Sequence, residues 1–199
     1  MLCLTTSTDA RWSERAADNL PILLSDHAHC EMKAASNALS LAARIPQLPK
    51  VARVLVALAK EELDHYDAVL AELERREVAL PPPGIDDYAV ELRKATRRQG
   101  KPTFEAALLD RFLIAALIEA RSCERLGMLS KTLEARGDGR LAGFYGELFV
   151  SEARHYSTFV DLATNIFGDE PKVRARLTEI AAAEGKIAAK LGIHPTVHG

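Results

Sequence analysis

Apolar residues recur every three or four positions along most of the chain, which is the period of an amphipathic α-helix. No stretch alternates convincingly between apolar and polar residues, as a half-buried strand would. Proline- and glycine-containing breaks divide the helical pattern into segments. Four long helices are predicted, over residues 25–45, 49–76, 102–135 and 140–167.

Residues that cap or break helices mark the predicted ends. Ser25 is a candidate N-cap for the first long helix, and Pro49 suits the first turn of the second. The sequence PPPG at 81–84 then interrupts the chain. Three further helices are predicted over about 11–20, over 86–99, and from the GDEP sequence at 168–171 to about residue 191.

The lengths of the connections indicate how the long helices are arranged. Short turns join the first to the second and the third to the fourth, whereas roughly residues 77–101 separate the second from the third. Two helix pairs joined by one long connection are typical of a four-helix bundle with a crossover. We therefore predict an all-α bundle with extra N- and C-terminal helices, in a single domain over residues 1–199.

Composition adds few constraints. Hydrophobic residues make up 48% and charged residues 27%, and the net charge is −2, so the chain as a whole lacks the basic character of many nucleic-acid-binding proteins. No apolar run reaches the roughly 18 to 20 residues of a membrane span, and no signal peptide is evident. The three cysteines, Cys3, Cys30 and Cys123, are odd in number and form no C-x-x-C motif. This usage predicts reduced thiols and a cytoplasmic location.

The motif E-x-x-H-Y occurs twice on predicted helices. It pairs Glu62 with His65 in EELDHY, and Glu152 with His155 in SEARHY. Residues three apart lie on one helix face, so each pair can supply an oxygen and a nitrogen to one metal ion. Apolar residues surround both pairs at helical spacing, which makes a purely solvated face a poor explanation.

Each motif follows a helix that carries another glutamate on its apolar face. Glu31 precedes Glu62 by 31 positions, and Glu119 precedes Glu152 by 33, which gives a faint internal repeat. Four buried carboxylates would repel one another strongly, and buried charges are costly unless a cation balances them. Two divalent metal ions would resolve this, and the arrangement is that of ferritin-like di-iron and di-manganese proteins. The candidate metal ligands are Glu31, Glu62, His65, Glu119, Glu152 and His155.

Several neighbouring residues compete for these roles. Glu124 offers an alternative to Glu119, although Glu119 keeps the repeat spacing. Glu61 is four residues from His65 but lies off the apolar stripe. His27, one turn before Glu31, is either a residue beside the site or an ordinary polar residue. The competing interpretation of the whole set is a helical interaction module with structural buried charges.

The donor set narrows the metal but not the reaction. Several carboxylates with two imidazoles suit iron or manganese better than zinc. A pair of ferrous ions can reduce O2, which is compatible with substrate hydroxylation, with iron oxidation and storage, or with peroxide removal. Motif spacing does not separate these outcomes.

Four stretches, DHAHCEMKAA, EELDHY, LIEARSCERL and SEARHY, resemble those of the MiaE-type tRNA hydroxylases, a family of ferritin-like di-iron monooxygenases. The resemblance covers about residues 20–167, and the metal-ligand pattern of the family falls on the six candidate ligands. It implies O2-dependent hydroxylation of the isopentenyl group of 2-methylthio-N6-isopentenyladenosine in tRNA. Two iron ions, O2 as co-substrate and an external electron donor, hence an electron-transfer partner, are implied with it. The main alternative remains a ferritin-like iron-oxidising or peroxide-handling protein.

A tRNA substrate would require cations that contact phosphates. The sequence ELRKATRRQGK places basic residues four apart, so we predict that one face of the helix in the crossover is basic. Arg136 and Arg140 form a second candidate group. Without the family resemblance, such charge runs would be explained more simply as a solvated surface. The candidate tRNA contacts in the crossover are Arg93, Lys94, Arg97, Arg98 and Lys101.

Overall fold

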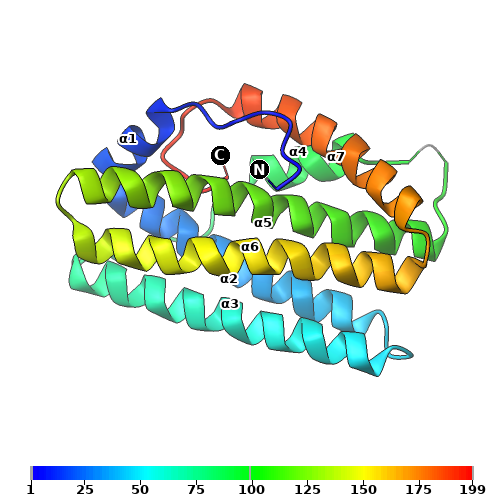
Figure 1. Cartoon of the computed structure of the whole chain (residues 1–199). Helices are drawn as coiled ribbons and strands as arrows, with labels where there is room; N and C mark the ends of the chain where they lie inside the picture. Colours follow the sequence, from blue (N-terminus) through cyan, green and yellow to red (C-terminus); the bar gives the residue numbers. More distant parts are fainter. Residues whose placement is uncertain (1, 99, 199) are drawn as a thin grey trace. The chain divides into compact units, whose positions relative to one another are not determined.

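A computed structural model describes residues 2–98 and 100–198 of the chain. These residues form seven α-helices and no strand, which confirms the predicted all-α class (Figure 1). None of the described helices is both long and apolar enough to cross a membrane. The helices are α1 (Arg11–Asp18), α2 (Leu20–Ala43), α3 (Pro49–Arg75), α4 (Asp87–Ala95), α5 (Phe104–Ala135), α6 (Gly139–Phe167) and α7 (Glu170–Leu191).

The chain divides into two compact units. The helix-pair unit, Asn19–Ile85, contains α2 and α3. The five-helix unit combines the residues up to Asp18 with those from Asp86 onward, and so contains α1 and α4 to α7. The single domain predicted over residues 1–199 stays a prediction.

In the helix-pair unit, α2 and α3 pack against each other as an antiparallel pair. The second helix of the pair begins at Pro49, as predicted. The first begins at Leu20 and not near Ser25, because Pro21 occupies its first turn, where a missing N–H costs nothing. Ser25 is therefore inside the helix, where its hydroxyl donates to the Pro21 carbonyl at 2.8 Å, and the predicted N-cap is wrong.

In the five-helix unit, α5 and α6 form the second antiparallel pair, and α1, α4 and α7 each contact α5. The turn between α5 and α6 contains Gly137 at φ 83°, a left-handed conformation that glycine adopts without strain. Asp138 then caps α6 by accepting a hydrogen bond from the Leu141 N–H at 3.1 Å. Phe112 and Phe159 meet edge to face between the two helices, with ring centroids 6.2 Å apart.

The crossover helix is shorter than predicted. It starts as expected, with Asp86 accepting from the Ala89 N–H at 2.9 Å, but it ends at Ala95. The side chain of Thr96, the C-cap residue, donates to the Leu92 carbonyl at 2.8 Å. The helix predicted to reach Gln99 is therefore wrong beyond Ala95, and Gln99 itself lies outside the described residues.

Candidate metal centre

The helix-pair unit brings three predicted ligands together. Glu31 comes from α2, and Glu62 and His65 come from one face of α3; each offers a ligand atom within 4.8 Å of the others. His65 Nδ1 lies 3.4 Å from Glu62 Oε2 and 3.6 Å from Glu31 Oε2. The three-residue spacing of the motif and the packing of α2 on α3 thus produce a half-site of two carboxylates and one imidazole.

The side chains of this half-site shift one another's pKa values. Burial raises the pKa of the Glu31 carboxyl, but hydrogen bonds from His27 and His65 outweigh it and hold the pKa well below its usual value. Burial lowers the pKa of His65, but the Glu31 and Glu62 carboxylates more than compensate and raise it to about 10. The Glu31 and Glu62 carboxylates therefore favour a positive charge next to them, which is the electrostatic property expected of a cation site.

His27 is the residue whose role the sequence left open. Its Nε2 lies 2.6 Å from Glu31 Oε1, and only 1% of its surface is exposed. The signal in the sequence was its position one turn before Glu31 on the same apolar face. His27 thus lies beside the half-site and contacts one of its carboxylates.

The five-helix unit carries the other three predicted ligands. Glu119 comes from α5, and Glu152 and His155 come from one face of α6; all three side chains are buried. Glu119 and His155 offer ligand atoms within 4.8 Å of each other. The second E-x-x-H motif and its preceding glutamate therefore lie on two helices that pack together, as in the first unit.

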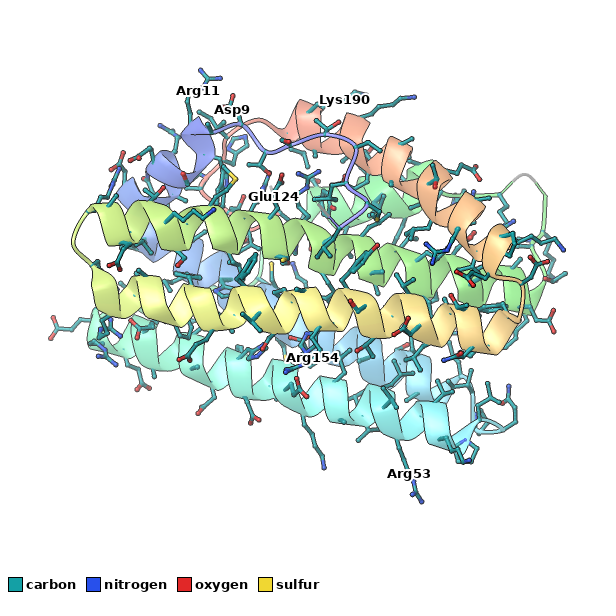
Figure 2. All side chains as sticks on the ribbon, in the orientation of Figure 1. Asp9, Arg11, Arg53, Glu124, Arg154 and Lys190 are labelled. Carbon is teal, nitrogen blue, oxygen red and sulfur yellow. The ribbon has the colours of Figure 1, made fainter. Side chains whose placement is uncertain are left out.

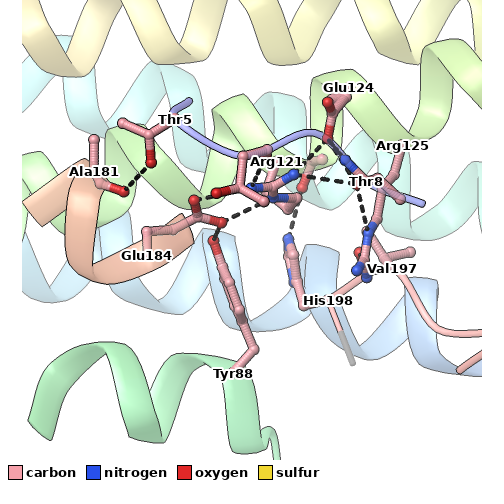
Figure 3. A network of polar contacts seen from close by, with 12 residues as sticks. Thr5, Thr8, Tyr88, Arg121, Glu124, Arg125, Ala181, Glu184, Val197 and His198 are labelled. Carbon is pink, nitrogen blue, oxygen red and sulfur yellow. Dashed lines mark hydrogen bonds and ion pairs between the residues drawn. The ribbon is translucent and has the colours of Figure 1, made fainter. Parts of the chain in front are cut away.

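Glu124, the rival to Glu119, has a different role. Its side chain is labelled in Figure 2. The carboxylate accepts from the N–H and the hydroxyl of Thr8, at 3.1 and 2.6 Å, and forms an ion pair with Arg121 (Figure 3). These contacts fix the N-terminal segment on α5. Glu119, which lies beside His155, is therefore the better ligand candidate of the two.

Arg121, two residues after Glu119, is the centre of a buried network that sequence reasoning missed (Figure 3). Its guanidinium donates to both carboxylate oxygens of Glu184 on α7, at 2.8 and 2.9 Å, and to the Thr6 carbonyl at 2.9 Å. Tyr88 on α4 donates to the same Glu184 at 2.9 Å. The network joins the ligand-bearing part of α5 to α4, α7 and the N-terminal segment. No local pattern reveals a partner 63 residues away.

Taken separately, each unit supplies two carboxylates and one imidazole, and this donor chemistry fits iron or manganese. Zinc sites usually have four ligands and more nitrogen or sulfur. The sequence also matches a known protein family. The family described as MiaE, tRNA-(MS[2]IO[6]A)-hydroxylase, matches residues 1–199.

The chain belongs to the MiaE family.

Two relatives bear the name tRNA 2-(methylsulfanyl)-N(6)-isopentenyladenosine(37) hydroxylase. The one from Pseudomonas putida is 40% identical over 177 residues, covering 89% of this chain and 82% of the relative. The one from Salmonella typhimurium is 30% identical over 218 residues, covering 85% and 78%. The resemblance seen in the four motif stretches is thus confirmed, and with it the assignment to the tRNA hydroxylases.

A solved structure supports the fold class. A Synechococcus protein described as having aldehyde deformylating oxygenase activity matches with a TM-score of 0.86 and 35% identity, over 98% of this chain and 95% of its own. This likeness confirms the ferritin-like fold.

The basic face predicted for the MiaE-family crossover is wrong, because α4 ends at Ala95 and residues 97 and 101 do not continue its helix. Arg98 donates to both oxygens of Asp110, each at 2.9 Å, and Lys94 pairs with Glu91 at 2.8 Å. In the second candidate group for tRNA contacts, Arg136 and Arg140, Arg136 forms ion pairs with Glu14 and Asp18. Of the predicted tRNA contacts, the structure leaves three exposed cations outside these ion pairs: Arg93, Arg97 and Lys101.

A cavity of about 360 Å³ in the helix-pair unit lies between α2 and the segment that follows α3. Ile22, His29 and Lys33 line it from α2, together with Pro81 and Ile85. By helical periodicity, these α2 positions face away from Glu31. The cavity therefore does not mark the metal-binding side of the helix.

Proposed function

We propose that this chain hydroxylates the isopentenyl side chain of 2-methylthio-N6-isopentenyladenosine in tRNA. The observation that carries the proposal is the match of residues 1–199 to the MiaE family, together with carboxylate and imidazole ligand atoms that lie close together within each unit. One atom of O2 would enter a C–H bond to give the alcohol, and the other would leave as water. The balance requires two electrons and two protons from an external donor, hence an electron-transfer partner.

We infer that the two half-sites together hold two iron ions. The proposed ligands are Glu31, Glu62, His65, Glu119, Glu152 and His155. Four carboxylates offset the charge of two divalent ions, so the occupied centre would be close to neutral. When bound, the iron ions would supply the redox chemistry that activates O2.

The chain's own residues would provide position and exclusion of water. Both histidines lie one turn after a glutamate, so that helix geometry sets the distance between each oxygen and nitrogen donor. The ligands of both units are buried, apart from the slightly exposed His65, which protects a reactive centre from bulk water. The ligand-bearing helices also carry buried apolar residues beside the ligands in the sequence, such as Ala28, Ala35 and Ala59, and such surroundings suit a prenyl group better than a charged group.

The tRNA would be held by contacts to its phosphates. Arg93, Arg97 and Lys101 are the cations we propose for this role, because they are exposed and lie close together in the chain. We place the reaction in the cytoplasm, where tRNA occurs and where the thiols of all three cysteines are kept reduced.

The deciding experiment measures modified nucleosides in tRNA. Iron-loaded protein is incubated with hypomodified tRNA, a reductant system and O2, and the digested tRNA is analysed by mass spectrometry for a gain of one oxygen on the prenylated adenosine. We expect the wild-type protein to convert it and to bind two iron ions per chain, whereas His155→Ala converts none. Because apolar burial provides most of the fold's stability, metal-free His155→Ala should still fold. No conversion by wild-type protein with two iron ions would overturn the substrate, and wild-type conversion by His155→Ala would overturn the ligand assignment.

An aldehyde is the informative counter-substrate, because of the similarity to the Synechococcus protein described as having aldehyde deformylating oxygenase activity. Turnover of the aldehyde with no turnover of tRNA would favour that second function.

A further inference from the structure

His27 is a buried histidine beside one proposed metal ligand. Its Nε2 lies 2.6 Å from Glu31 Oε1, one turn further along α2. An ionised carboxylate can only accept hydrogen bonds, so His27 is the donor and its Nε2 carries the proton. A buried, charge-assisted hydrogen bond of this length is among the stronger contacts available to a side chain.

This hydrogen bond fixes the orientation of Glu31. The oxygen that His27 contacts is Oε1, whereas the other oxygen, Oε2, lies 3.6 Å from His65 Nδ1. Glu31 is therefore held with one oxygen toward its own helix and the other toward the ligand cluster. All of these residues belong to the helix-pair unit.

We propose that His27 is a positioning residue that orders Glu31 for metal binding. The inference rests on the proposed metal centre and adds a residue outside its six ligands. Ordering a ligand before the metal arrives removes part of the entropy cost of binding. Loss of such outer partners typically lowers metal affinity by about 10- to 100-fold.

The effect should be confined to one half of the centre. Through this bond His27 contacts Glu31, a ligand of the helix-pair unit, and the helix position one turn before Glu119 is Ala115, whose methyl group donates no hydrogen bond. Removal of the His27 donor should therefore weaken one metal-binding step and leave the other close to its wild-type value.

Two neutral polar substitutions separate positioning from packing. In His27→Gln, the amide nitrogen extends about as far as Nε2 and can still donate to Glu31. In His27→Asn, the amide ends about where Nδ1 lies and falls short. His29→Asn is the matched control, because His29 is on the same helix but its Nε2 bonds to the Pro81 carbonyl at 2.7 Å.

The readout is titration of metal-free, full-length protein with Co²⁺, followed by its visible absorption. We expect two binding steps for the wild type, His29→Asn and His27→Gln. In His27→Asn, one step should weaken by about 10- to 100-fold while the other persists. In the hydroxylation assay, kcat should fall for His27→Asn, whereas KM for tRNA should not change because His27 is buried.

The outcomes distinguish this inference from the proposed function. Equal Co²⁺ affinity in wild type and His27→Asn, or equal weakening in His27→Gln and His27→Asn, would overturn the positioning role while the metal centre stands. A wild-type protein that binds no Co²⁺ and does not hydroxylate tRNA would contradict both the positioning role of His27 and the proposed function. Circular dichroism checks folding of the metal-free variants, and His27→Ser replaces His27→Asn in the comparison if the latter does not fold.

Discussion

Arg121 illustrates, at the scale of single residues, what a buried charge requires in this fold. It is completely buried, and its donors contact Glu184, Glu124 and Thr6. Burial lowers the pKa of a guanidinium, but the hydrogen bonds to Glu184 reverse this and keep the pKa above its usual value. Arg121 is therefore charged in the folded protein, and its removal would leave buried carboxylates without their main cation.

Replacement of Arg121 by Met should lower the free energy of unfolding of the metal-free protein by about 3–5 kcal/mol, because one partner of a buried ion pair is lost. The double variant Arg121→Met with Glu184→Leu should recover a large part of this loss, since it also removes the stranded carboxylate. Urea denaturation measures both. A single variant as stable as the wild type would show that the network is energetically unimportant.

The ligands of the metal site differ from the residues around them in how far the sequence predicts them. Glu62, His65, Glu152 and His155 are detectable because ligand spacing on one helix is a local property, repeated in the two halves of the chain. The contact of His27 with Glu31 follows the same helix geometry, but local spacing cannot tell a positioning residue from an ordinary one. Glu184 was not predicted, because its meeting with Arg121 depends on how α7 packs on α5.

At the scale of helices, the start of α4 was predictable from the sequence, but its end was not. Pro49 and Asp86 mark helix starts through local backbone chemistry, and both are found where expected. The end of α4 depends on distant residues. Arg176 on α7 donates to the Thr96 carbonyl at 2.8 Å and to both oxygens of Asp110, while Arg98 contacts the same carboxylate. The basic stretch after α4 therefore does not continue the helix. One of its residues, Arg98, instead holds this segment against α5 through Asp110.

The contacts of Asp110 with Arg98 and Arg176 should make the free energy of unfolding depend on pH. Burial raises the pKa of Asp110, but Arg176 and Arg98 outweigh it, so the folded-state pKa is below the unfolded value of about 3.9. Stabilisation by the carboxylate is thus complete well above pH 4 and disappears as the pH falls through the folded-state pKa. Asp110→Asn should cost about 2 kcal/mol at pH 7, and the difference from wild type should shrink toward pH 3.

Denaturant unfolding of both proteins at several pH values measures that difference. Glu91→Gln serves as the control, because its exposed pair with Lys94 should contribute little at any pH. A wild-type advantage over Asp110→Asn that stayed constant down to pH 3 would contradict the assigned role of the ionised carboxylate.

At the scale of the whole molecule, family and fold class follow from features spread along the chain. Helix periodicity predicts the four long helices, and the repeat of glutamate and E-x-x-H predicts a ligand set in each half. The tRNA-binding surface is less accessible to sequence reasoning, because ion pairs decide which cations remain available. Arg98 and Arg136 looked equivalent to Arg97 in the sequence but are bound to Asp110 and Glu14, respectively.

A net charge of −2 gives the protein little general attraction for RNA, so a few clustered cations should dominate tRNA binding. Changing Arg93, Arg97 and Lys101 together to Glu should weaken tRNA binding and reduce the slope of log affinity against log salt by about 1 for each lost phosphate contact. Iron content and turnover of the free prenylated nucleoside should stay at wild-type levels, because that substrate has no distant phosphates. The control changes Arg53 and Lys190, exposed cations that project separately from α3 and α7, to Glu (Figure 2). Equal weakening by both sets would indicate a general charge effect, and unchanged tRNA affinity in the triple variant would place the docking surface elsewhere on the protein.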